Sequence, residues 1–389
     1  MNEYDLLIHG DVWDAASGRR SDRWVAVTDG EIEGVYENEP GEAAAVHDVA
    51  LVTPGLIDMH VHLVWDGSGD PVATLRGESE QELTVRAVEN ADEQLRGGVT
   101  TVRDLGSVGD VAITVARAIR AGRIEGPRVY ASGRTIIISG GHDPFWGIES
   151  DGERACRQAV RRLRAAGADL IKVSATGGVY GQAVGEEPGT SELSTSELSA
   201  IVDEADRFDL PVAAHAVGRD GIANAVEAGV DTIEHGNLMD EETLSSLREK
   251  DIAYDPTLFV YREIAESDAD IPSYARKNAR GIVDNHRTVA AAALDSDARV
   301  LAGSDAGSPG TPHPSLHREL ADLVEVGAEE AAALEAATLT PAREIGRPEL
   351  GAIAAGTPAD LVGFDADPLS EITVTETPSV VVRDGAIVR

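Results

Sequence analysis

The sequence predicts an α/β protein in which a (β/α)8 barrel is joined to a small β-sandwich domain. Short strand-like segments with turn residues occupy both ends of the chain, whereas strand-like and helix-like segments alternate through its middle. The 389 residues exceed the usual size of one compact domain, but they suit a barrel of ~250 residues with an appended domain. We therefore expect residues 54–345 to form the barrel, and residues 1–53 together with 346–389 to form the sandwich.

The two ends of the chain share a pattern of short apolar strands and tight turns. Asp29-Gly30 is a hairpin signal near the N-terminus, and Asp384-Gly385 repeats it near the C-terminus. Two such ends around a long middle predict one small sheet domain that is assembled from both termini. The expected strands are residues 4–10, 24–30, 31–36, 359–364 and 380–388.

The middle of the chain contains eight strand-then-helix units, which is the number in a closed (β/α)8 barrel. Two connections, residues 179–198 and 258–298, are longer than the others and are expected to act as lids or to line a substrate pocket. Ser194 and Glu197 in the first form a capping-box signal, and the second is expected to contain extra helices. The expected strands are residues 53–63, 98–104, 128–132, 170–175, 211–215, 231–236, 252–256 and 299–305, and the clearest helices are 80–97, 111–121 and 153–166.

The chain is strongly acidic, with 69 acidic and 33 basic residues and a formal net charge of −36. Such a surface repels nucleic acid and anionic membranes, so we expect a small-molecule substrate and neither of those partners. No apolar run approaches the ~18 residues of a membrane span, and residues 1–5 lack the basic start of a signal peptide. The expected location is the cytoplasm.

We interpret the acidic surface as an adaptation to a cytoplasm of high salt. Its charges repel one another in dilute buffer, whereas at about 1 M salt the Debye length falls to ~3 Å and screens the repulsion. Lys172, Lys250 and Lys277 are the only lysines, so nearly all the positive charge is arginine. We predict that fold and activity are lost on desalting, as circular dichroism and an activity assay across KCl concentrations would measure. Equal stability at low and multimolar KCl would contradict this prediction.

Polar side chains that can bind a metal stand at or near the ends of apolar strands. His60 and His62 are two apart on one strand, so both point to the same side of it. Alone, this pair is explained equally well as two hydrogen-bonded core histidines. In a closed barrel, however, the strand ends share one mouth, where candidates from other strands would join the pair in a metal site. These candidates are Lys172, His215, His235 and Asp305, the last of which could by itself be a turn residue.

Lys172 lies in a largely apolar strand, where desolvation is expected to lower the pKa of its ammonium toward neutrality. A neutral amine reacts with carbon dioxide to form a carbamate, an oxygen ligand that is able to bridge two cations. The alternative is a lysine that is paired with a nearby carboxylate. Since Cys156 is the only cysteine, any metal would be held by His, Asp, Glu or a modified Lys.

Taken together, these segments resemble the amidohydrolase superfamily over nearly the whole chain. The resemblance implies two divalent metal ions, usually zinc, with carboxylated Lys172 as the bridging ligand. It places His60, His62 and Asp305 on one ion, and His215 and His235 on the other. The segments that carry it are Pro54-Gly55-Leu56-Ile57-Asp58-Met59-His60-Val61-His62, Ile171-Lys172-Val173, Thr176-Gly177-Gly178, His215, Glu234-His235-Gly236, Gly303-Ser304-Asp305-Ala306-Gly307 and Gly356-Thr357-Pro358-Ala359-Asp360-Leu361-Val362.

Two segments, Thr176-Gly177-Gly178 and Gly140-Gly141-His142-Asp143, are most similar to the imidazolonepropionase-like branch that contains Xaa-Pro and Xaa-Arg dipeptidases. By this resemblance His142 and Tyr261 are candidates for contacting the substrate carboxylate or the polarised carbonyl. The alternatives are a solvated loop histidine and a core tyrosine. The chain departs from many relatives in having Ala216-Val217 where they have a second histidine. Members of this branch are often oligomeric, so a homo-oligomer is expected.

The implied function is cleavage of a peptide-like amide by a hydroxide that bridges the two metal ions, as in a dipeptidase, a prolidase or an N-acyl amino acid hydrolase. Asp305 is the candidate catalytic residue because it is the one carboxylate in the cluster and could move a proton to the leaving nitrogen. One alternative is a cyclic amidohydrolase or deaminase with a single metal ion, against which Lys172 counts. The other is an inactive binding or scaffold protein, against which the complete ligand set counts.

Overall fold

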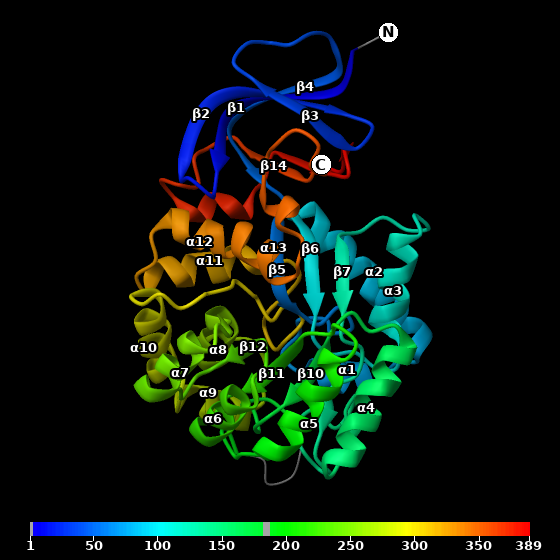
Figure 1. Ribbon diagram of the computed structural model, residues 1–389, viewed down its shortest axis with the longest axis vertical. Helices are drawn as coiled ribbons and strands as arrows, with labels where there is room; N and C mark the ends of the chain where they lie inside the picture. Colours follow the sequence, from blue (N-terminus) through cyan, green and yellow to red (C-terminus); the bar gives the residue numbers. More distant parts are fainter. Residues whose placement is uncertain (1–2, 182–186) are drawn as a thin grey trace.

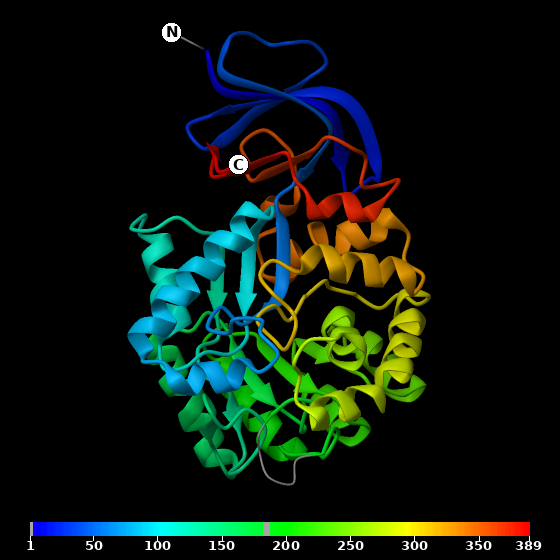
Figure 2. The ribbon, with the colours of Figure 1, turned by 180° about the vertical axis from the view of Figure 1, so that it is seen from behind.

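A computed structural model describes residues 3–181 and 187–389 of the chain. In Figure 1 the two chain ends lie together at the top of the molecule, above a body of strands that is surrounded by helices. Strand β5 (Leu56–Val61) runs from the upper part into this body. Figure 2 shows from behind that the same strand continues from the upper part into the lower one.

One seven-stranded sheet in the upper part is built from both ends of the chain. Its strand β4 pairs in parallel with β1 and antiparallel with β14, so it joins the N-terminal strands to the C-terminal ones. Asp29 and Gly30 connect β2 to β3 with φ angles of 51° and 86°, as a type I′ hairpin requires. That these strands form a sandwich remains a prediction. The strand order is β16 (Ala386–Ile387), β15 (Val380–Arg383), β14 (Leu361–Phe364), β4 (Ala43–Pro54), β1 (Tyr4–Asp14), β2 (Arg19–Thr28) and β3 (Glu31–Tyr36).

Parallel strands form two further sheets in the lower part. Every residue of β5 and β6 is buried, so these strands do not alternate between an inner and a solvent-exposed face, and their polar residues are buried as well. One sheet contains β5, β6 (Val99–Asp104) and β7 (Arg128–Ala131). The other has the order β13 (Ala253–Asp255), β12 (Thr232–His235), β11 (Val212–Ala216), β10 (Ile171–Ser174), β8 (Ile136–Ile137) and β9 (Ile148–Glu149).

The segment 299–306 lies between β13 and β5 but is not a regular strand, in contrast to the strand expected at 299–305. It forms only isolated bridges, from Val300 to β13 and from Ala306 to β5. The ladder is irregular here because the carboxylate of Asp58, rather than a backbone carbonyl, accepts hydrogen bonds from the backbone N and the Oγ of Ser304. Asp58 thereby anchors this segment to β5.

Helices pack around the parallel strands, and α4 shows why the sequence forms them. Its buried residues Cys156, Ala159, Val160 and Leu163 recur at helical spacing, and Gly167 ends it with a φ of 100°. None of the helices in the described residues combines the length and apolarity needed to cross a membrane. The helices before the second long connection are α1 (Pro71–Gly77), α2 (Glu80–Arg96), α3 (Val111–Arg120), α4 (Glu153–Ala166), α5 (Thr195–Asp206), α6 (Arg219–Ala228) and α7 (Glu241–Glu249).

The two long connections differ in what they contain. Ser194 and Glu197 form the expected capping box at the start of α5, while residues 182–186 of this connection lie outside the described residues. The second connection contains three helices, as expected. From there to the C-terminal strands the helices are α8 (Leu258–Glu266), α9 (Ser273–Arg280), α10 (Val283–Leu294), α11 (Leu316–Glu325), α12 (Glu330–Ala336), α13 (Leu339–Glu344) and the 3-10 helices η1 (Pro348–Gly351) and η2 (Ile372–Glu376).

Candidate active site

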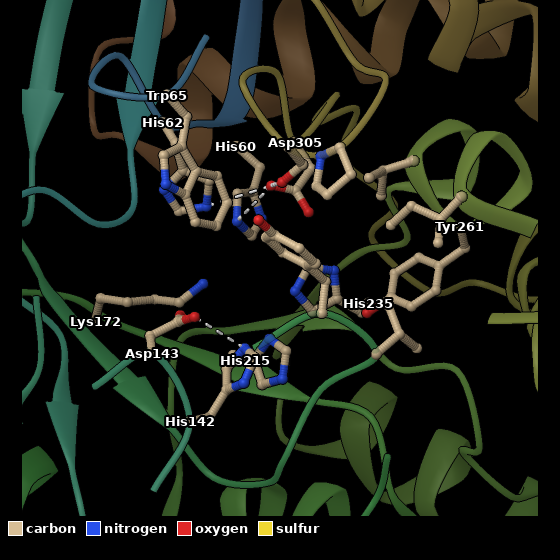
Figure 3. A pocket seen from close by; sticks show the side chains of 16 residues that line it. His60, His62, Trp65, His142, Asp143, Lys172, His215, His235, Tyr261 and Asp305 are labelled. Atoms are coloured by element: carbon tan, nitrogen blue, oxygen red, sulfur yellow. Dashed lines mark hydrogen bonds and ion pairs between the residues drawn. The ribbon is translucent and has the colours of Figure 1, made fainter. Parts of the chain in front are cut away.

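All eight side chains that the sequence singles out line one pocket (Figure 3). The pocket lies where β5, β10, β11 and β12 end. The side chains come from seven separate stretches of the chain and point toward a common centre. They are His60, His62, His142, Lys172, His215, His235, Tyr261 and Asp305.

His60, His62 and Asp305 form one side of the pocket. The Oδ1 of Asp305 lies 3.3 Å from the Nε2 of His62 and 3.9 Å from the Nε2 of His60. The hydroxyl of Ser308 donates a hydrogen bond to the same Oδ1 over 2.8 Å. Three ligand-type side chains, from β5, from the residue just after it and from the 299–306 segment, therefore meet at one carboxylate oxygen.

His215 and His235 stand opposite, with ring centroids 4.7 Å apart. His235 also lies 5.0 Å from the ring of His60, so the two sides of the pocket are continuous. The Nε2 of His215 is buried without a hydrogen-bond partner among the described residues. A buried imidazole nitrogen in that state lacks the partner that native structures supply, and a bound cation would be one.

Each of three histidines has its Nδ1 bound to a group outside the pocket. The Nδ1 of His60 lies 3.0 Å from Glu234 Oε2, and that of His62 lies 3.2 Å from the carbonyl oxygen of Gly106. The Nδ1 of His235 lies 2.7 Å from the hydroxyl of Thr257. These contacts fix the rings and leave Nε2 to face the pocket, as groups that hydrogen-bond the outer nitrogen of a metal-binding histidine do.

The protonation states of the histidines suit metal binding. Burial, with the nearby positive charge of Lys172, holds the pKa values of His60, His215 and His235 well below the ordinary value, so these rings are neutral. Burial also opposes the charged form of His62, but its hydrogen bond and attraction to Asp305 raise its pKa overall. Burial raises the pKa of Asp305, yet His60 and His62 lower it more, and the carboxylate stays ionised.

Lys172 lies in β10 with 2% of its surface exposed. Burial lowers the pKa of its amine, as the sequence predicts. In the part of the chain that the structure describes, no carboxylate lies within 4.0 Å of its Nζ, so the alternative of a simple ion pair gains no support there. Figure 3 shows the side chain extended into the pocket beside Asp143.

His142 and Tyr261 lie on opposite walls of the pocket (Figure 3). The ring of His142 stacks on His215 at 4.3 Å, and its Nε2 lies 3.3 Å from Asp143 Oδ1. Tyr261, on α8, contacts His235 edge-on at 5.4 Å. Both are buried, so His142 is not a solvated loop residue, and both are placed to touch a molecule that lies against the histidines.

Several residues at this site have a left-handed backbone that is uncommon for non-glycine residues. His235 has a φ of 70°, Asp305 of 54°, Asp143 of 57° and Thr257 of 51°. Three of them line the pocket, and Thr257 holds His235. Strain of this kind clusters at functional sites, where the surrounding structure enforces it.

An apolar wall completes the pocket and was missed from the sequence. Trp65 packs beside His62 at 4.8 Å and beside Tyr180 at 6.0 Å, and both aromatic residues line the pocket. Val179, Val260 and Ile264 also line it. No polar signal distinguishes such residues from core residues in the sequence; only the position of Trp65 soon after the His60 and His62 strand could have indicated a role.

Gly303→Ala is predicted to disrupt the site. A Cβ at this position would lie 2.3 Å from Asp255 Oδ2 and 2.7 Å from the Cβ of His60, so the strand that carries His60 would have to move. Overpacking of this kind costs about 1–3 kcal/mol of stability. We expect a lower melting temperature and at least a tenfold loss of activity, whereas Gly77→Ala, which meets nothing within 4 Å, serves as the control. Wild-type activity in Gly303→Ala would contradict the described packing.

The donor set fits a divalent metal ion. Ligand atoms of His60, His235 and Asp305, all buried, lie within 4.8 Å of one another. Neutral imidazoles with a carboxylate are the ligands that zinc and related cations prefer. Fold and site together define a class of protein, namely hydrolases that hold divalent metal ions where parallel strands end.

Comparison with known proteins gives the family. Residues 51–388 match the amidohydrolase family, and the chain belongs to that family. An ochratoxinase of Aspergillus niger is 30% identical over 370 residues, covering 87% of this chain and 75% of the relative. A solved Xaa-Pro dipeptidase with methionine bound in its active site has a TM-score of 0.90 at 30% identity, covering 98% of this chain and 99% of that one. A prolidase complexed with N-methylphosphonate-L-proline has a TM-score of 0.89 at 28% identity, covering 98% of both chains.

These matches confirm the resemblance that the motifs carry. The protein is a metal-dependent hydrolase that acts on the carbon–nitrogen bonds of amides. Family membership also implies a TIM barrel with an additional domain, and the structure is α/β as expected. The roles of individual residues remain predictions.

Proposed function

We propose that this protein is a dipeptidase or N-acyl amino acid hydrolase that cleaves its substrate with two divalent metal ions, of which zinc is the usual one. The observation that carries the proposal is the meeting of six candidate ligands in one buried pocket. The Xaa-Pro dipeptidase and prolidase relatives, which this chain covers over 99% and 98% of their own lengths, favour the same substrate class.

The proposed ligand assignment is the one that the resemblance to the amidohydrolase family implies. His60, His62 and Asp305 would hold one ion, and His215 with His235 the other. Lys172, as a carbamate, would bridge them. Two cations bound here would lower the pKa of a water molecule to near 7 and polarise the carbonyl of the substrate.

The residues of the chain itself provide positioning and proton transfer. The ionised carboxylate of Asp305 accepts the proton of the attacking water and delivers it to the leaving nitrogen. His142 and Tyr261, on opposite walls, donate hydrogen bonds to the carboxylate of the substrate or to its carbonyl oxygen. Trp65 and the other apolar residues cover the site and exclude bulk water, which strengthens these interactions.

The walls of the pocket favour an apolar substrate side chain. Trp65, Val179, Tyr180, Val260 and Ile264 provide the apolar surface. Among the described residues that line the pocket there is no arginine, so recognition of the substrate carboxylate rests on His142 and Tyr261. We therefore favour dipeptides or N-acyl amino acids with apolar residues, proline included.

A second part of the proposal concerns the fold. We propose that residues 54–345 form a closed (β/α)8 barrel and that residues 1–53 with 346–389 form a composite β-sandwich domain. Hydrogen bonds from segment 299–306 to both β13 and β5, and from Asp169 N to Ala131 O between β7 and the start of β10, support closure. A cytoplasmic location, a homo-oligomeric state and adaptation to high salt complete the proposal.

A substrate screen at high salt tests this function. Purified protein with added zinc or manganese would be assayed on dipeptides, N-acyl amino acids, lactones and cyclic imides, with bound metal counted by elemental analysis. We expect two ions per chain and turnover of dipeptides or N-acyl amino acids. One ion per chain, with turnover only of cyclic imides or with ammonia release, would instead indicate the cyclic amidohydrolase or deaminase alternative. No bound ion and no turnover would indicate a binding protein.

A further inference from the structure

A buried polar network lies beneath the candidate metal ligand His60. Its centre is Arg103 of β6, which is 5% exposed. The guanidinium uses all three nitrogens: Nε donates to the carbonyl oxygen of Met59 over 2.6 Å, Nη1 to the hydroxyl of Thr232 over 3.1 Å, and Nη2 to Glu234 Oε1 over 2.8 Å. One side chain therefore ties together three strands, β5, β6 and β12.

Glu234 links this network to the metal site. Its Oε1 accepts hydrogen bonds from Arg103 and from the hydroxyl of Thr232, while its Oε2 lies 3.0 Å from the Nδ1 of His60. Glu234 and Thr232 are 0% and 1% exposed, so water does not compete for these contacts. A carboxylate held by an arginine accepts only, and the Nδ1 of His60 must therefore be the donor.

We propose that Arg103 is a positioning residue for the metal site: it holds the carboxylate of Glu234 so that Glu234 fixes His60 in the tautomer whose Nε2 carries a free electron pair. That electron pair is what a cation at the proposed site requires. Without Arg103 the carboxylate would lose its fixed orientation, and the ring of His60 could turn or change tautomer. The inference rests on the proposed metal-dependent function, because it concerns the ligand His60.

Arginine is the side chain that this geometry needs. Its planar fork reaches a backbone carbonyl, a hydroxyl and a carboxylate at fixed angles, whereas a lysine ammonium is a point charge on a flexible stem. Arg103→Lys therefore keeps the charge in the network and removes the directionality. Glu234→Gln is the complementary change, because it keeps the shape of the side chain and removes the charge that Arg103 orients.

The experiment compares metal binding rather than turnover. Metal-free wild-type, Arg103→Lys and Glu234→Gln proteins would be titrated with Zn²⁺ against a chromophoric chelator, and with Co²⁺ while its absorption spectrum is recorded. Thermal unfolding would be measured in parallel. The control is Arg128→Met, which breaks the buried ion pair of Arg128 with Asp360 at a distance from the pocket.

We expect both network variants to bind one of the two ions about 10- to 100-fold more weakly, the range known for changes in the partners of metal ligands. The Co²⁺ spectrum should change as well. Arg128→Met should lose stability and keep wild-type affinity.

Wild-type affinity and an unchanged spectrum in either network variant would overturn the proposal; if Arg103→Lys fails to fold, Glu234→Gln decides alone. The comparison needs no substrate, so a failure of the proposed function shows in wild-type turnover and a failure of this proposal shows in variant affinities.

Discussion

Replacing Asp305 with asparagine is expected to lower kcat by about 10²- to 10⁴-fold, the contribution typical of a positioned general acid–base group, while most of the bound metal remains. Asparagine keeps the shape of the side chain and an oxygen that can ligate a cation. It cannot accept the proton of the attacking water. Since Asp305 lies 3.3 Å from His62 Nε2 and receives a hydrogen bond from Ser308, its position should be preserved in the variant.

The measurement is kcat and KM on the best substrate of the screen, together with the metal content. Asp360→Asn is a matched control, because Asp360 is also a buried carboxylate but pairs with Arg128 outside the pocket. It should lose stability and keep its activity per folded molecule. Near-normal turnover of Asp305→Asn would refute the catalytic role. Loss of all metal from the variant would indicate that Asp305 acts as a metal ligand and not as the proton-transfer group.

Much of the site could be predicted because its residues are polar, whereas their neighbours in the sequence are apolar. His60, His62 and Lys172 are polar residues in apolar strands, and such residues need a functional or pairing reason to be buried. The order of strands then predicts that their ends share one mouth. The structure places all eight predicted side chains around one pocket, although their individual roles are untested.

The same logic could have found Arg103 and Glu234. Both are charged residues inside buried strands, and their opposite charges predict a pair. The apolar wall could not be predicted in this way, because the sequence alone does not distinguish Trp65 and Tyr180 from ordinary core residues. The prediction of a strand at 299–305 was wrong because of a contact between segments far apart in the sequence. The side chain of Asp58, and not a backbone carbonyl, accepts the hydrogen bond from the backbone N–H of Ser304.

Lys172→Ala is expected to reduce activity by about a thousandfold or more, because two cations held at one site need the oxygen ligands of a bridging group. Lys172 is buried in β10, its amine pKa is lowered by burial, and its partner strand β11 presents Ala213 beside it. Because the neutral form of an amine is the one that reacts with carbon dioxide, the lowered pKa favours formation of the proposed carbamate. Truncation to alanine removes the amine on which the proposed carbamate would form and leaves room in the pocket.

Small carboxylates should then restore part of the activity of Lys172→Ala. Formate, acetate or propionate can enter the vacated space and supply the two oxygens that the carbamate supplied. Lys172→Arg is the matched control: it fills the space and keeps a charge, but a guanidinium stays protonated and forms no carbamate, so it should be inactive and should not respond to carboxylates. The measurement is kcat/KM against carboxylate concentration, with metal content at each step.

Two results would contradict the bridging role of Lys172. Substantial activity of Lys172→Arg would show that a carbamate is unnecessary, because arginine cannot provide one. Native mass spectrometry would show the same if the fully active, metal-loaded wild-type protein carried no covalently bound carbon dioxide. Lys172 is unusual because its amine is buried without a carboxylate partner among the described residues. If neither result is found, and carboxylates rescue Lys172→Ala but not Lys172→Arg, conversion of the lysine into an anionic carbamate explains this feature.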